Sequence, residues 1–256
     1  MRVVVSVLCA LFLALPAIAV EKKSGAALTE RGVTSYLLES TANANVVRVE
    51  LRDRGQVIGT VTVETRSADD HIITYEPLAG EAFVIDALMS RSELTFRTAH
   101  ERVTARFDKQ QTKWNRTGSD SLYRRIKPEV DIAGRLLVEL QERGVVASPA
   151  IPQASSDAAK VPCSSQKFGG VSSDLQQDPG TGGDTGSGSC SGISYDCSAA
   201  ATSATMACNK AKASCNQLCW NQYCVGCCGF TTCASSCESV WCGASVTGRS
   251  CRAGDR

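Results

Sequence analysis

The sequence predicts an α+β protein with two domains. The first is an antiparallel β-sheet domain with one helix packed at its C-terminal end. The second is a small α-helical, hairpin-like module stapled by disulfides. Two observations lead to this fold class. Apolar and polar residues alternate through much of the first half of the chain, as they do in strands with one buried face. Twelve of the 14 cysteines lie between Cys190 and Cys251, a density typical of disulfide-rich exported domains.

Alternation is clearest in four segments, which we expect to be strands: residues 47–52, 57–64, 94–98 and 103–108. Asp53-Arg54-Gly55-Gln56 separates the first two and is typical of a hairpin turn. Short consecutive strands without a helical pattern between them favour an antiparallel sheet. We therefore place a β domain at residues 32–146.

One helix, at residues 128–143, is expected to close this domain. Pro128 suits a first helical turn, and Glu129 and Asp131 favour the positive end of the helix dipole. Apolar side chains then recur at helical spacing, at Ile132, Leu136, Leu137 and Leu140. Such a stripe is expected to pack on the sheet.

The chain is expected to be exported. Residues 1–19 combine one basic residue, an apolar run and a small-x-small site at Ala17–Ala19, which is typical of a cleavable signal peptide. No second apolar segment follows, so we expect no membrane span after cleavage and a secreted or periplasmic location. Residues 20–31 are interpreted as an N-terminal tail. Residues 147–189 are rich in Gly, Ser and Pro and are interpreted as a linker.

Residues 190–256 form the predicted cysteine-rich module. The alanine-rich segment 198–222 predicts a helix, with Cys197, Cys208, Cys215 and Cys219 in one stripe. The spacing Cys215-x3-Cys219-x4-Cys224 recurs at Cys233, Cys237 and Cys242. Two short helices folded back on each other would pair Cys215 with Cys237 and Cys219 with Cys233. This arrangement resembles the twin C-x3-C helical hairpin of small disulfide-rich peptides and of some mitochondrial import chaperones.

Six disulfides are expected within the module. Their cysteines are Cys190, Cys197, Cys208, Cys215, Cys219, Cys224, Cys227, Cys228, Cys233, Cys237, Cys242 and Cys251. The other four pairings stay open. Cleavage of the signal peptide leaves thirteen cysteines, an odd number, so at least one cannot pair within a monomer. Cys163, in the linker, is expected to be a free thiol or to join two chains in a covalent dimer.

The charge balance argues against a nucleic-acid partner. The chain has 27 basic and 26 acidic residues, so it lacks the net basic field that phosphate backbones require. Charged side chains on the predicted strands are interpreted as a solvated sheet face with cross-strand pairs. They are Arg48, Glu50, Arg52, Arg97, Arg102 and Arg106.

Two patterns could carry chemistry. Asp69, Asp70 and His71 could combine a general base with an orienting carboxylate, although the same residues suit a polar turn. The other histidine, His100, lies at an expected hairpin tip. Cys224, Cys227 and Cys228 could bind zinc together with Cys233, but no histidine lies in the module, and an oxidising compartment favours disulfides.

We therefore predict a secreted, non-enzymatic binding or interaction protein. No residue is assigned to catalysis, to a cofactor or to a metal, and no cofactor is expected. The partner is an unidentified extracellular or periplasmic ligand or protein. Two alternatives stay open: a secreted hydrolase with its site in the β domain, at Asp69, Asp70 or His71, and a metal-binding cysteine-rich protein.

Overall fold

The computed structural model describes residues 19–39, 41–148, 193–223, 227 and 229–250. The expected signal peptide, apart from residue 19, lies outside these residues, as does the expected linker, apart from residues 147 and 148. Five of the cysteines discussed above also lie outside them: Cys163, Cys190, Cys224, Cys228 and Cys251. Below, residues 19–148 are called the β-sheet body and residues 193–250 the cysteine-rich module.

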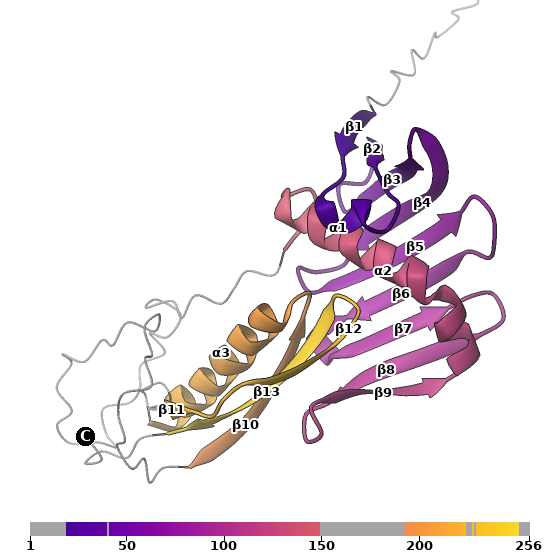
Figure 1. The fold of residues 1–256 in the computed structure, drawn as a ribbon. Helices are drawn as coiled ribbons and strands as arrows, with labels where there is room; N and C mark the ends of the chain where they lie inside the picture. The colour runs from indigo at the N-terminus through magenta and orange to yellow at the C-terminus, as the bar shows by residue number, and fades with distance from the viewer. Residues whose placement is uncertain (1–18, 40, 149–192, 224–226, 228, 251–256) are drawn as a thin grey trace, which may run out of the picture.

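The body contains one antiparallel sheet whose nine strands follow one another in chain order (Figure 1). The chain reverses between β3 and β4 at Arg54 and Gly55. Their φ angles are positive, 48° and 83°, as a tight hairpin requires. Four strands overlap the segments in which alternation predicted them, so the antiparallel sheet is confirmed. The strands are β1 (Val20–Lys23), β2 (Ser35–Glu39), β3 (Val46–Asp53), β4 (Gln56–Thr65), β5 (Asp70–Pro77), β6 (Phe83–Leu88), β7 (Glu93–Arg97), β8 (Arg102–Asp108) and β9 (Lys113–Gly118).

Helix α2 (Asp120–Glu142) lies across one face of this sheet (Figure 1). Ser119 caps it, since its Oγ accepts a hydrogen bond from the backbone N–H of Leu122 at 3.2 Å. The prediction that the helix begins at Pro128 is wrong, because Pro128 lies inside it. The turns before Pro128 bury Leu122 and Tyr123 against the sheet, and this burial offsets the hydrogen bond that proline cannot donate.

Residues 20–31 differ from the tail that was expected. Val20–Lys23 pairs with β2, and Ala26–Thr29 forms the short helix α1, whose Leu28 is fully buried. The backbone N–H of Gly25 donates to Glu139 Oε2 of α2 at 2.9 Å. Four residues per element are too few to show a period, so the sequence pattern did not reveal them.

The module consists of a helix packed on a small antiparallel sheet. Helix α3 (Ala204–Tyr223) confirms most of the predicted alanine-rich helix. The predicted second helix is wrong, because strands β12 and β13 form a hairpin there. The central strand β13 pairs with each of the other three. The strands are β10 (Ser194–Ala201), β11 (Gly229–Phe230), β12 (Ala234–Glu238) and β13 (Trp241–Arg249). A short 3₁₀ helix in the body, η1 (Met89–Arg91), completes the described elements.

Four disulfides join all eight cysteines among the described residues: Cys197–Cys215, Cys208–Cys233, Cys219–Cys227 and Cys237–Cys242. The predicted pairs Cys215–Cys237 and Cys219–Cys233 are therefore wrong. Cys237 lies directly opposite Cys242 across the β12–β13 hairpin, so a strand partner replaces the helix partner. Of the four cysteines predicted in one helical stripe, Cys208, Cys215 and Cys219 lie on α3, but Cys197 lies in β10, so its placement on the helix is wrong. Helix α3 packs on strands and not on a second helix.

The module and the body share buried side chains. Trp241 is fully buried, and its ring makes an edge contact with Phe96 of β7 at 6.4 Å between centroids. Trp241, Val240 and Ala200 belong to the same apolar core as the sheet and α2. Polar contacts surround this junction: Trp114 Nε1 donates to the Ser236 carbonyl at 3.2 Å, and Tyr123 donates to Glu238.

Two glycines allow the close approach at this junction. A Cβ at Gly134 of α2 would lie 2.7 Å from Val240 Cγ2, and one at Gly243 would overlap the Phe107 ring. A Cβ atom at either position would come closer to its neighbour than real Cβ contacts do, so this packing requires glycine at both positions. Figure 1 shows the module beside the part of the sheet that contains β6 to β9.

Candidate functional site

Asp69, Asp70 and His71 are drawn into three separate sets of contacts. Asp69 forms an ion pair with Lys210 of α3. Asp70 accepts two hydrogen bonds from Ser90, from the backbone N–H at 3.0 Å and from Oγ at 2.7 Å. These contacts hold η1 and the module against the end of β5. Both carboxylates therefore have hydrogen-bonding or ionic partners within the protein, and neither needs a substrate to satisfy it.

His71 is 1% exposed and lies between the sheet, α2 and the module. Its Nε2 is 3.2 Å from Gln141 Nε2, and the Oε1 of the same glutamine accepts a hydrogen bond from Thr202 Oγ1 at 3.3 Å. Burial lowers the pKa of His71, while the Ala68 backbone and the nearby Asp70 and Asp69 carboxylates act in the opposite direction. A general base must reach its substrate, and this imidazole is enclosed by the protein.

The other sequence candidates also have local partners. His100 is exposed in the β7–β8 turn, where its backbone N–H donates to Thr98 Oγ1 at 3.3 Å. Cross-strand ion pairs engage Arg97 with Asp86 and Arg106 with Glu93, and Arg48 and Arg52 pair with Glu39 and Glu50. Four of the five predicted arginines are thus held by neighbouring carboxylates, as expected of a solvated sheet face, whereas Arg102 is exposed and forms no ion pair with the described residues.

The cysteines that suggested zinc are engaged elsewhere. Cys227 is bonded to Cys219, and Cys233 to Cys208, so neither offers a thiolate to a metal. The other two, Cys224 and Cys228, lie outside the described residues. Within the described part of the chain, no three His, Cys, Asp or Glu side chains gather closely enough to hold an ion.

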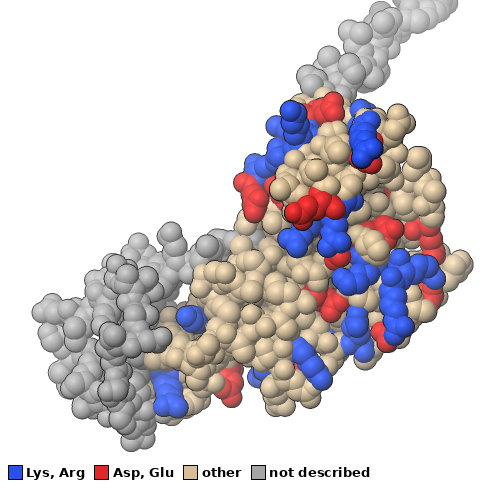
Figure 2. All heavy atoms as spheres, viewed as in Figure 1, with Lys and Arg blue, Asp and Glu red and all other residues tan. Residues whose placement is uncertain are grey.

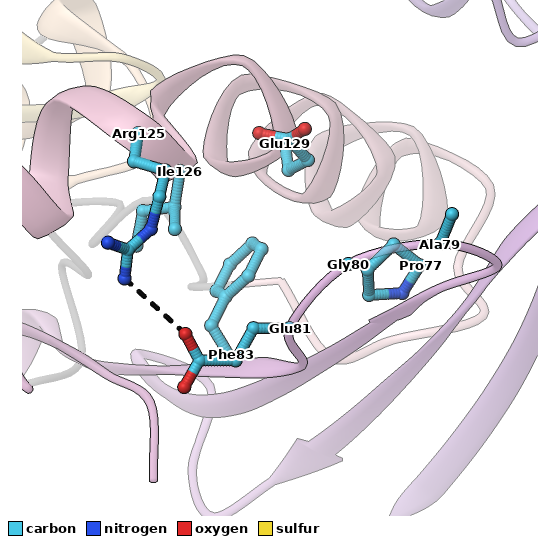
Figure 3. Close-up of a pocket in the computed structure, with 8 residues that line it drawn as sticks. All are labelled: Pro77, Ala79, Gly80, Glu81, Phe83, Arg125, Ile126 and Glu129. Carbon is cyan, nitrogen blue, oxygen red and sulfur yellow. Dashed lines mark hydrogen bonds and ion pairs between the residues drawn. The ribbon is translucent and has the colours of Figure 1, made fainter. Parts of the chain in front are cut away.

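A cleft of about 360 Å³ lies between α2 and the loop that joins β5 to β6 (Figure 3). This volume is at the lower end of the range for small-molecule sites. Apolar side chains supply much of its wall, and three charged groups reach it. The lining residues are Pro77, Ala79, Gly80, Glu81, Phe83, Arg125, Ile126 and Glu129.

Helical spacing brings the α2 residues of this cleft together. Glu129 follows Arg125 by four positions and Ile126 by three, so it lies next to both on the helix surface. Opposite them, Phe83 stacks on Tyr75 with centroids 5.3 Å apart. Leu78, which lies between the lining residues Pro77 and Ala79 in the chain, is 75% exposed.

The charged groups in the cleft differ in whether they have a hydrogen-bonding or ionic partner. Arg125 pairs with Glu81 at 3.4 Å and with Glu101 at 2.7 Å. By contrast, Glu129 Oε2 is buried and has no hydrogen-bond partner among the described residues. A buried acceptor without a partner costs about 1–3 kcal/mol, and more if it is charged. The pKa of Tyr75 is raised by burial and, to a smaller extent, by the charge of Glu129.

Sequence reasoning missed this cleft. It placed Glu129 in a first helical turn beside Pro128, where a carboxylate needs no partner other than the helix dipole. The structure begins the helix at Asp120 and places Glu129 in its interior, facing the sheet. The (i, i+4) spacing of Arg125 and Glu129 was a usable signal once the helix start was known.

A second cleft, of about 390 Å³, lies at the other end of the sheet between β1, β2 and β3, and includes Val20 and Val145. In contrast to the first, it has no buried polar atom without a partner among the residues that line it. We therefore take the α2 cleft as the candidate site.

No protein-family model matches this chain, and neither curated proteins nor solved structures give a significant match. None of the helices described in the structure combines the length and apolar character that crossing a membrane requires.

Proposed function

We propose that this chain is an exported binding protein without catalytic activity, and that it takes its ligand in the cleft between α2 and the β5–β6 loop. The observation that carries the proposal is Glu129 Oε2, a buried acceptor without a partner among the described residues, in a recess whose walls are largely apolar. Binding sites combine apolar walls with a few polar groups that orient the ligand. A bound donor group would satisfy this oxygen.

Export is supported by the cysteine chemistry. Four disulfides in a segment of small residues fit a protein that folds in an oxidising compartment. They are compatible with the secreted or periplasmic location that residues 1–19 predict. The mass of the exported protein tests this directly: cleavage after Ala19 should leave Val20 as the first residue.

The binding site is tested by closing it. We expect Ala79→Trp to fill the cleft and to abolish the thermal shift given by small-molecule ligands of the oxidised protein. Thr205→Trp, on an exposed position of α3, is the matched control and should leave those shifts unchanged. Ligands that bind equally well to both variants would overturn the cleft as the binding site.

The hydrolase alternative is separated by a different variant. Turnover of any substrate that is lost on His71→Ala but kept in Ala79→Trp would replace the binding proposal with catalysis near β5. The metal alternative is separated by metal analysis of the oxidised protein after dialysis. A stoichiometric metal released by chelator would favour it.

A further inference from the structure

The charges around the α2 cleft favour a cation. Two carboxylates, Glu81 and Glu129, and one guanidinium, Arg125, line it. The guanidinium is already shared between Glu81 and Glu101. Figure 3 shows Arg125 extending towards Glu81, while Glu129 lies one helical turn further along α2. The group left without a partner in the described structure is therefore the acidic one.

The walls favour an apolar group beside that cation. Phe83, Ile126 and Pro77 face the recess, and Phe83 is held in place by stacking on the buried Tyr75.

Other ligand chemistries fit less well. An anion would meet Arg125 only after displacing Glu81 or Glu101, both of which already bond to it. A divalent metal needs several oxygen ligands, and the described residues contain no group of three or more metal-binding side chains. A purely apolar ligand would leave Glu129 Oε2 unpaired and more thoroughly desolvated.

Resting on the proposed function of this cleft, we infer that its ligands are primary amines carried on an aromatic or branched aliphatic group. The ammonium donates to Glu129 Oε2, and the apolar group lies against Phe83 and Ile126. The inference concerns the shared chemistry, whether the amine belongs to a free small molecule or to the end of a peptide.

Nuclear magnetic resonance titration of the mature, oxidised protein provides the test, with three probes that share a phenyl group. We expect phenethylamine to shift the backbone amides of Gly80, Phe83 and Ile126 in a saturable manner. Its neutral isostere 2-phenylethanol should bind at least tenfold more weakly. The anion 3-phenylpropanoate should leave these amides unshifted.

The isosteric variant Glu129→Gln should weaken phenethylamine binding at least tenfold while its amide spectrum stays that of a folded protein. Glu76→Gln removes the same charge from an exposed position of β5 and should have no effect. A dipeptide with a free N-terminal phenylalanine, compared with its N-acetylated form, separates peptide ends from free amines.

The outcomes separate the two levels of the proposal. Equal binding of the amine and the alcohol, or full binding by Glu129→Gln, overturns the cation and leaves the cleft as a binding site. Tight binding of the carboxylate at the same amides also overturns the cation. If no probe of any charge perturbs these amides, and Ala79→Trp changes no binding, both the inference and the proposed function fail.

Discussion

The β-sheet body and the cysteine-rich module reach a folded state by different means. The body has no cysteine among its described residues and buries a large set of aliphatic and aromatic side chains between its sheet and α2. The module buries mostly alanine and cysteine, in two small clusters, and four disulfides cross-link its described residues. Its largest buried side chain, Trp241, lies in the core of the body. The comparison indicates that the module depends on disulfides and on its neighbour, whereas the body depends mainly on its own core.

The largest expected effect is that of reduction. Each native disulfide contributes about 2–4 kcal/mol, chiefly by restricting the unfolded chain, and the module has little apolar area to replace that contribution. In reductant, we expect the amides of α3 and β13 to lose hydrogen-exchange protection while those of β3 to β6 keep it. If β3 to β6 lose protection together with α3, the two regions are not separate domains.

Removal of the shared side chain comes next. Trp241→Ala should lower the free energy of unfolding of the oxidised protein by about 3–5 kcal/mol, because it leaves a cavity against Phe96 and Gly134. Chemical denaturation followed by far-ultraviolet circular dichroism measures this loss. Leu218→Ala, on an exposed position of α3, should change the free energy by less than about 0.5 kcal/mol. A cost for Trp241→Ala as small as this would mean that the docked junction does not persist in solution.

Close packing at the junction can be tested by whether Gly134→Ala raises or lowers the free energy of unfolding. Alanine is favoured over glycine in a helix by about 1 kcal/mol, so propensity alone predicts that Gly134→Ala stabilises α2. The contact with Val240 predicts the opposite, a loss of about 1–3 kcal/mol from overpacking. Gly243→Ala should destabilise through the Phe107 ring. Gly229→Ala, with open space around it, is the control. A stabilised Gly134→Ala protein would contradict the junction.

The smallest effect concerns pH. Burial holds the pKa of His71 below its ordinary value of 6.5, so the unfolded chain takes up a proton before the folded one does. Stability should therefore fall as pH drops through about 6.5, by at most about 1.4 kcal/mol per pH unit, and level off below the folded pKa. His71→Gln should remove this slope and the exposed His100→Gln should keep it, as measured by denaturation between pH 5 and pH 8. Equal slopes in both variants would contradict a buried neutral imidazole.

Local pattern accounted for much of the body. Alternation over 47–52 and 57–64 is repeated in β3 and β4 because the buried face of each strand is a local property of its sequence. The start of α2 was missed because Pro128 matches a first helical turn as a matter of local preference. Burial of Leu122 and Tyr123 on the sheet is a tertiary effect, and it extends the helix through the proline.

Tertiary pairing decided the module. Ala199 to Ala201 are strong helix formers, yet they lie in β10 opposite Ala244, Gly243 and Cys242, since small residues allow close strand packing. The repeated cysteine spacing predicted two similar helices, but the second copy turns at Ser239, which has a φ of 58°, and becomes a hairpin. Disulfide partners depend on which strand lies opposite, and spacing alone does not contain that information.

The candidate cleft shows the same limit. Its Phe83 and its Glu129 come from distant parts of the chain, and each taken alone suits a strand core or a helix surface. Only the crossing of α2 over β6 brings them together. The sequence predicted the helix that carries Glu129, but it predicted neither the strands β5 and β6 nor the helix start that turns Glu129 towards the cleft.

The strand order of the body has a consequence for the order in which the chain folds. Each strand pairs with its neighbours in sequence, and contacts of short sequence separation form quickly. The ring closed by Cys237–Cys242 is local too, with a separation of 5 residues. Junction contacts join residues 122 and 133 positions apart, which makes them slow to form. We therefore expect the β12–β13 hairpin and the sheet of the body to form first and to dock afterwards. The final step of folding is then the recognition of one part of the chain by another.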